Sequence, residues 1–185
     1  NREDYYNRLK LLRQHGMSVN DRVRHESSKI VFEDHLELAY NYRLTDIQAA
    51  VGIKQLEKLD WIIEERRKIA NQYLNALKDI DCIRLPFEQD GYFSNYQSFS
   101  IYIKPSSPIS RNELMQRMLD DEIATRRGIM TSHRETAYKD AYKDAELPIS
   151  EDACDNIILI PLYIPMAQED IDRVIARFRF HLTGK

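Results

Sequence analysis

The pattern of apolar and polar residues predicts helices and strands along most of the chain. Residues 3–14 show the apolar spacing of a helix, and Gly16 follows as a typical helix stop. From Asp46 to about residue 80 the apolar residues keep near-helical spacing over a run longer than a typical globular helix. This run predicts a long linking helix over residues 45–80, or two helices with a bend near Asp60.

Beyond residue 80 the period changes to that of strands. Strict alternation over residues 95–104 predicts a half-buried strand. Shorter apolar runs predict strands at 82–85, 123–127 and 157–162, and helical spacing predicts helices at 111–121 and 168–182. Ser110 and Glu113 have the spacing of a capping box at the start of the first of these helices. Strands interleaved with helices indicate an α+β fold with a three- or four-stranded sheet covered by helices.

Residues 17–39 show no clean period. They predict a loop with a possible short strand at 29–32. His25 and His35 stand ten residues apart among charged residues, without metal-ligand spacing, so both are expected at the surface. Two cysteines, Cys82 and Cys154, are too few for a disulfide framework and have no metal-ligand neighbours. The sequence therefore predicts reduced thiols and no metal site.

Composition narrows the class of protein further. Hydrophobic residues make up 43% of the chain, which is enough to form a buried core, and charged residues make up 31%. A net charge of -3 argues against non-specific binding of nucleic acid. The sequence has no apolar run near the ~20 residues of a membrane span and no signal peptide at its start. We therefore expect no membrane association and a cytoplasmic location. The absence of an initial Met suggests a processed or partial chain.

Residues 40–50 hold the most informative chemistry. Thr45 and Gln48 have the spacing of a capping box. A helix N-terminus carries a partial positive charge and unpaired N–H groups, which favour an anion nearby. Asn41 adds a neutral donor just before this point, and Arg43 adds a planar cation suited to phosphate. The pattern predicts an anion site at a helix entrance; the alternative is a capped helix with a solvated arginine.

The same stretch, YNYRLTDIQAA, resembles the DegT-type sugar aminotransferases. The resemblance continues through the segments Gly52, 55–59, 66–67, 125–129, His133 and 160–163, and it begins upstream at His15-Gly16. Members of that family are fold type I enzymes that use pyridoxal 5'-phosphate (PLP) to aminate keto-sugars attached to nucleotides. The chain resembles only the C-terminal half of a member. The resemblance implies a tail of the large domain with a cofactor-site loop at 1–44, the linking helix at 45–80, and a small C-terminal α+β domain at 81–185.

The resemblance also implies roles for individual residues. Asn41 matches an asparagine that, in the family's homodimers, donates to the PLP phosphate of the other subunit; otherwise it is a turn residue. Arg43 matches an arginine suited to the diphosphate of a nucleotide-sugar, or it packs at the helix entrance. His133 matches a substrate-site histidine, although the Tyr-Pro pair of many relatives is absent, and a solvated loop histidine is the alternative. Arg126 either holds an anionic substrate or flanks a strand, and His15 has no assigned role.

The lysine that binds PLP in this family lies upstream of the matching region. No lysine here has the family's flanking Ser and Gly-Gly residues, so no catalytic residue is expected in this chain, and the chain alone is expected to be inactive. The whole protein is expected to transfer an amino group from an amino-acid donor to a nucleotide-linked keto-sugar, for surface-glycan or amino-sugar biosynthesis. The expected donor is glutamate. Two alternatives remain: a relative that carries His in place of the lysine and dehydrates sugars, and a non-catalytic self-associating module.

Overall fold

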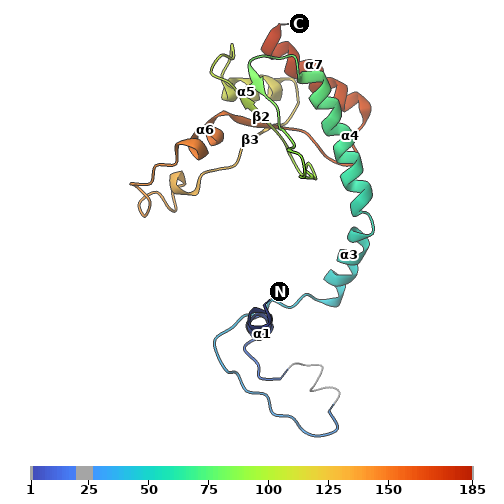
Figure 1. The fold of residues 1–185 in the computed structure, drawn as a ribbon, viewed down its shortest axis with the longest axis vertical. Coiled ribbons are helices and arrows are strands. Elements are labelled where there is room, and N and C mark those ends of the chain that lie inside the picture. The colour runs from blue at the N-terminus through green and yellow to red at the C-terminus, as the bar shows by residue number, and fades with distance from the viewer. Residues whose placement is uncertain (1, 20–26, 185) are drawn as a thin grey trace. The chain divides into compact units, whose positions relative to one another are not determined.

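The computed structural model describes residues 2–19 and 27–184, which form two compact units (Figure 1). The N-terminal unit spans Asn1–Glu57 and the C-terminal unit spans Lys58–Lys185. The predicted surface residue His25 lies outside the described residues. Each unit is described by itself.

A helix and a paired loop make up most of the N-terminal unit. Helix α1, Glu3–Leu12, stops as predicted before Gly16, whose φ of 68° is left-handed. A side chain at Gly16 would place its Cβ 2.4 Å from the carbonyl oxygen of Glu37, so only glycine fits here. His15, also left-handed at φ 54°, donates its backbone N–H to the carbonyl of Tyr40. His15, which had no assigned role in the sequence analysis, therefore has a structural role at the end of α1.

The loop after α1 differs in part from the prediction. Residues 29–32 are not in a strand; backbone pairing instead joins Gln14 to Asn41 and Met17 to His35. His35 is exposed, as expected, and its Nδ1 lies 2.9 Å from the carbonyl oxygen of His15. These short bridges fix residues 35–42 against the end of α1.

The long apolar run from Asp46 forms two helices. Helix α3, Asp46–Leu56, belongs to the N-terminal unit, and helix α4, Leu59–Leu77, belongs to the C-terminal unit. The interruption falls at Glu57 and Lys58, slightly before the predicted bend near Asp60. Helix α3 buries none of its residues, whereas α4 buries four in the core of its unit. The two helices therefore have different surroundings although their sequences share one period.

An antiparallel sheet of four strands forms the centre of the C-terminal unit. Its order is β1-β2-β4-β3, and the strands are β1 Ile83–Arg84, β2 Phe99–Ile103, β3 Arg126–Arg127 and β4 Ile157–Ile160. Phe99 lies opposite Ile160, and Ile101 lies opposite Ile158, so both pairs share one face. The alternation in β2 buries every second residue, as its sequence predicts. The predicted α+β class with a small sheet is confirmed.

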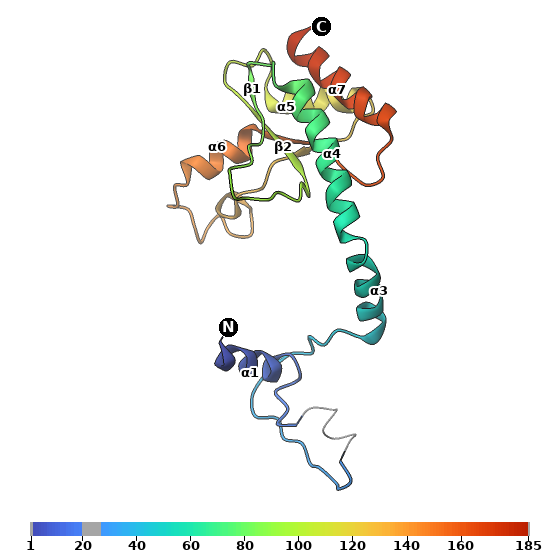
Figure 2. The ribbon, with the colours of Figure 1, turned by 45° about the vertical axis from the view of Figure 1, so that its right-hand side comes forward.

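Three helices cover the apolar face of the sheet. They are α4, α5 (Arg111–Asp120) and α7 (Gln168–Thr183), and α4 and α7 run side by side in Figures 1 and 2. The largest fully buried side chains join these helices to the strands: Tyr73, Leu77, Phe99, Ile101, Leu114, Met118, Ile158 and Phe178. The Tyr73 hydroxyl also donates to the carbonyl of Pro161, at 2.7 Å. This core fixes the position of the sheet, whose opposite face lines the cavity described below.

Two local features differ from the prediction. Helix α6, Pro148–Asn156, lies in a stretch for which the apolar pattern predicted no helix. At α5, the Ser110 hydroxyl accepts from the backbone N–H of Glu113, but the Glu113 carboxylate binds Arg117 at 2.6 Å. The expected capping box is therefore only half formed, because a cation one turn along the helix takes the carboxylate.

Arg67 holds a loop against α4. Its guanidinium donates to both carboxylate oxygens of Glu88, at 2.8 and 2.9 Å, and to the carbonyl of Ser94, at 2.7 Å. It also lies 4.3 Å from the ring centroid of Phe93. Lys68, the next residue of α4, instead forms exposed pairs with Glu64 and Glu65.

The Arg67–Glu88 pair makes the stability of the C-terminal unit depend on pH. Arg67, and then the N–H of Ser94, lower the pKa of Glu88 from 4.5 to about 2. A lowered carboxyl pKa contributes stability above the ordinary value of 4.5, and this contribution is lost as the pH falls toward 2. We expect Glu88→Gln to lower the urea midpoint near neutral pH, and to lower it progressively less as the pH falls below 4.5. Glu64→Gln, in an exposed pair, should change little; equal losses for Glu88→Gln at all pH values would contradict this account.

Candidate functional site

Asn41 lies on a backbone that is fixed on both sides. The N–H groups of Tyr40 and Tyr42 donate to the carbonyls of Leu12 and Arg13, both at 2.9 Å. Asn41 itself pairs with Gln14 in an antiparallel bridge. Because this backbone is already fixed, less conformational freedom is lost when the side chain binds a ligand. The contacts with the end of α1 therefore hold Asn41 in position before a ligand binds.

Extended geometry places Asn41 and Arg43 on the same side of this segment. The rings of Tyr40 and Tyr42 stack with centroids 4.9 Å apart and planes 2° apart, so these two side chains share one side. Successive side chains of an extended segment alternate, which assigns Asn41 and Arg43 to the other side. Both residues line a hollow of about 520 Å³ together with residues 44–46 and Gln48. The structure thus brings together the two residues of this unit that the sequence selected.

The start of α3 completes the hollow. Thr45 and Gln48 form the predicted capping box: the Thr45 hydroxyl accepts from the N–H of Gln48, and the Gln48 side chain accepts from the N–H of Thr45 at 2.9 Å. Asp46 occupies the first turn, where its negative charge offsets part of the helix dipole. An anion in this hollow would therefore depend on Asn41 and Arg43 more than on the helix terminus.

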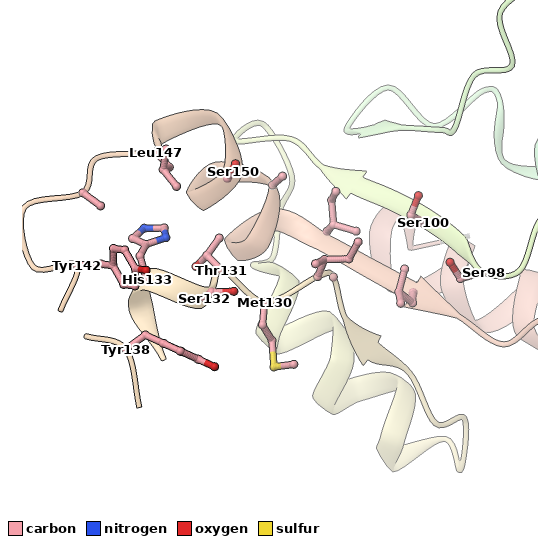
Figure 3. Close-up of a pocket in the computed structure, with 16 residues that line it drawn as sticks. Ser98, Ser100, Met130, Thr131, Ser132, His133, Tyr138, Tyr142, Leu147 and Ser150 are labelled. Atoms are coloured by element: carbon pink, nitrogen blue, oxygen red, sulfur yellow. The ribbon is translucent and has the colours of Figure 1, made fainter. Parts of the chain in front are cut away.

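A larger cavity lies on the second face of the sheet in the C-terminal unit (Figure 3). Its volume is about 760 Å³. Strands β2 and β4, helix α6 and residues 128–147 supply its lining. The polar groups in this lining are mainly hydroxyls, and they come from Ser98, Ser100, Thr131, Ser132, Tyr138, Tyr142 and Ser150. A cavity of this size, with hydroxyls and one imidazole on apolar walls, suits a small polar organic molecule.

His133 is the imidazole of this cavity. It lies in the short 3₁₀ turn η1, Ser132–Arg134, and its side chain is 9% exposed. Nε2 lies 2.7 Å from Oε1 of Glu151 on α6. Figure 3 shows the ring near Tyr142, at the end of the cavity opposite Ser98 and Ser100. His133 is therefore neither solvated nor alone, and sequence reasoning had missed its partner.

Arg126 lies on the same side of the sheet as the cavity. It is opposite Leu159, which lines the cavity and faces the same way as Ser100. Arg126 is exposed, and no hydrogen bond or ion pair joins its guanidinium to any other residue that the structure describes. Arg127 instead lies 3.7 Å from the Glu135 carboxylate. Of the two arginines, Arg126 has the charge available for a ligand.

Gly128 controls the path of the segment that enters the cavity. Its N–H donates to the carbonyl of Ile157 at 2.8 Å, and an added Cβ would lie 2.8 Å from the Cβ of Ile157. We expect Gly128→Ala to cost about 1–3 kcal/mol in unfolding free energy, because the buried methyl overpacks β4. Gly52→Ala in α3 is the control: its Cβ meets nothing within 4 Å, and alanine favours a helix by roughly 0.5–1 kcal/mol. Urea titrations of both variants test this, and an unchanged midpoint for Gly128→Ala would contradict it.

The sequence-selected residues fall into two groups. Asn41 and Arg43 share the hollow of the N-terminal unit, whereas His133 and Arg126 belong to the cavity side of the C-terminal unit. Within residues 2–19 and 27–184, no cluster of His, Cys, Asp and Glu is arranged to hold a metal ion. No helix of this described part is long and apolar enough to cross a membrane.

Solved structures of aminotransferases share this fold. The chain is 21% identical to a putative sugar aminotransferase, Spr1654 of Streptococcus pneumoniae, with a TM-score of 0.86 over 100% of this chain and 46% of that one. It is 19% identical to Helicobacter pylori PseC, an aminotransferase in pseudoaminic acid biosynthesis, with a TM-score of 0.85 over 100% and 48%. A Brucella abortus aminotransferase of the DegT/DnrJ/EryC1/StrS type is 26% identical, with a TM-score of 0.77 over 99% and 45%.

These matches define the chain as an α+β part of an aminotransferase-type protein, and it spans less than half the length of these relatives. The model of one family matches residues 1–179, nearly the whole chain. The chain belongs to the DegT/DnrJ/EryC1/StrS aminotransferase family, as its resemblance to that family predicted.

Proposed function

We propose that the protein to which this chain belongs is a PLP-dependent aminotransferase acting on a nucleotide-linked keto-sugar, with an amino acid such as glutamate as donor. The observation that carries the proposal is the family match over residues 1–179. When bound, PLP carries the amino group between donor and acceptor. The contribution of this chain is to hold the cofactor phosphate and to orient the sugar substrate.

The hollow of the N-terminal unit fits a phosphate. Asn41 offers a neutral amide donor, and Arg43 offers a planar cation that matches phosphate oxygens. We assign the cofactor phosphate to Asn41, acting in a second copy of the protein within a homodimer. Arg43 is assigned to the diphosphate of the nucleotide-sugar. Both assignments follow the family resemblance, and the alternation of the extended segment supports them.

The cavity of the C-terminal unit supports a sugar substrate. Its hydroxyl lining offers donors and acceptors to a polyhydroxylated ring, and His133 adds a group that either donates or accepts. Arg126, on the same side of the sheet, suits the anionic part of the substrate. We therefore assign His133 and Arg126 to substrate binding.

The linings of both sites lack one group that PLP chemistry needs. Among the described residues that line the hollow or the cavity there is no lysine, and PLP enzymes attach the cofactor to one. We assign the lysine to a part of the protein outside these residues, and we expect the isolated chain to be inactive.

Exposed apolar residues in the N-terminal unit support a larger assembly. No apolar residue of its described part is among the buried core residues, and its exposed ones include Leu38, Ile47 and Leu56. Exposed apolar surface of this kind marks a region that another surface covers. We assign that cover to the rest of the protein and to a second copy.

Amino transfer by the whole natural protein tests the proposal. With glutamate as donor, we expect the whole protein to convert nucleotide-linked keto-sugars to amino-sugars in a PLP-dependent reaction. Mass spectrometry identifies the products. The 185-residue chain alone should show no turnover. Loss of water from the sugar without amination would indicate a dehydratase instead. A protein that neither binds PLP nor converts any sugar would support a non-catalytic module and would contradict the proposal.

A further inference from the structure

Two ion pairs join the η1 turn to helix α6. The first is His133 Nε2 to Glu151 Oε1 at 2.7 Å, and the second is Arg134 Nη1 to Asp155 Oδ2 at 3.0 Å. Glu151 and Asp155 are four residues apart, so they lie on one side of α6, one turn from each other. The two pairs differ in surroundings: the His133 side chain is nearly buried at the cavity, whereas Arg134 and Asp155 are exposed.

The Glu151 carboxylate is held in place from a second direction. The backbone N–H of Leu147 donates to the same oxygen, Oε1, at 3.1 Å. This N–H, and then His133, lower the pKa of Glu151 below its ordinary value. Its position in the first turn of α6 also favours negative charge. The carboxylate is therefore ionised near neutral pH, and an ionised carboxylate only accepts hydrogen bonds.

An acceptor at this position determines which ring nitrogen of His133 carries a proton. Since Oε1 only accepts, Nε2 of His133 carries the proton of this bond. In the neutral form of the ring, this leaves Nδ1 as the acceptor. Among the described residues none forms a hydrogen bond with Nδ1, so His133, which lines the cavity, keeps an acceptor that a ligand can use.

We infer that Glu151 is a positioning residue: it orients His133 and selects the tautomer whose Nδ1 accepts a hydroxyl of the sugar substrate. This inference rests on the proposed function, because it gives His133 a substrate to contact. Glu151 itself touches His133 and Leu147 and does not line the cavity. It acts through His133.

A plain structural tether is the competing explanation, and the chain contains a matched control for it. The Arg134–Asp155 pair joins the same two elements without touching His133. If tethering alone mattered, removing either pair would have similar consequences. If Glu151 acts through His133, only the loss of Glu151 should affect the substrate.

A double-mutant cycle in the whole natural protein separates these explanations. The variants are Glu151→Ala, His133→Gln, the double variant and Asp155→Ala. The measurements are kcat and KM for the sugar substrate and for the amino donor, together with the calorimetric Kd of the nucleotide-sugar. The Kd gives a result that does not depend on turnover.

We expect Glu151→Ala, which removes the acceptor, to raise the KM and the Kd of the sugar substrate about tenfold, as for a lost hydrogen bond to a charged partner. The KM of the amino donor should stay unchanged. The double variant should be no worse than His133→Gln, and Asp155→Ala should stay within about twofold of the natural protein, as for exposed ion pairs.

Two results would overturn the inference. One is independent, multiplying losses for Glu151→Ala and His133→Gln; the other is an equal loss for Asp155→Ala and Glu151→Ala. Failure of the proposed function gives a different result, in which the natural protein itself transfers no amino group. The Kd cycle then still shows whether Glu151 acts through His133 on a bound sugar.

Discussion

Replacing Asn41 by aspartate should weaken binding of PLP to the whole natural protein by roughly 100-fold, because two like charges would then meet. The fixed backbone at Tyr40 and Tyr42 leaves the new carboxylate little freedom to move away. The negative Asp46 in the first turn of α3 already limits how much the helix terminus can offset a second anion. Equilibrium dialysis against PLP, with the protein at constant folded concentration, measures the effect.

Asn7→Asp provides the control for this change. Asn7 lies on an exposed position of α1, in the same unit, and the substitution adds the same charge. We expect it to leave PLP binding within about twofold, since Asn7 is exposed, does not line the hollow of Asn41, and an exposed charge is screened by salt. Equal effects of the two substitutions, or no effect of Asn41→Asp, would remove Asn41 from the cofactor site.

Replacing Phe99 by alanine should lower the unfolding free energy by about 3–5 kcal/mol, the cost of removing a buried ring and leaving a cavity. Phe99 is fully buried in β2, where its ring packs on those of Tyr73 and Tyr96. Typical domains have only about 5–15 kcal/mol of stability, so much of the C-terminal unit's stability depends on this side chain. Its neighbours Ser98 and Ser100 line the cavity, and the substitution should therefore loosen that wall as well.

Phe87→Ala removes the same ring from a position that is 88% exposed. We expect a change within about 0.5 kcal/mol, as for ordinary surface substitutions. Urea titration of the 185-residue chain, followed by circular dichroism, measures both variants. A loss below about 1 kcal/mol for Phe99→Ala would contradict the description of the core.

Local patterns predicted the regular elements well where one signal dominated. The alternation of β2, the stop of α1 at Gly16 and the capping box of Thr45 depend on neighbours in sequence, and the structure has all three. Helix α6 was missed because its nine residues show too few apolar positions for a clear period; Pro148 at its start was the available signal. The capping box predicted at Ser110 is only half formed because Arg117 binds the Glu113 carboxylate.

The sites required contacts that a sequence pattern does not contain. Asn41 and Arg43 could be grouped in advance because they are only two positions apart in the sequence. The pairing of His133 with Glu151 joins residues 18 positions apart, and the Arg67–Glu88 pair joins residues 21 apart. Such pairs depend on how elements pack in three dimensions. The hydroxyl-lined cavity likewise combines residues from two strands, a helix and a loop.

We propose that this chain is part of a PLP enzyme whose cofactor is bound to a lysine outside residues 1–185. Borohydride reduction of the natural protein makes the bond between PLP and its lysine permanent, and peptide mass spectrometry then locates it. The account predicts a modified lysine that lies outside residues 1–185. A modified lysine within these residues, or bound PLP with no modified lysine anywhere in the protein, would contradict it.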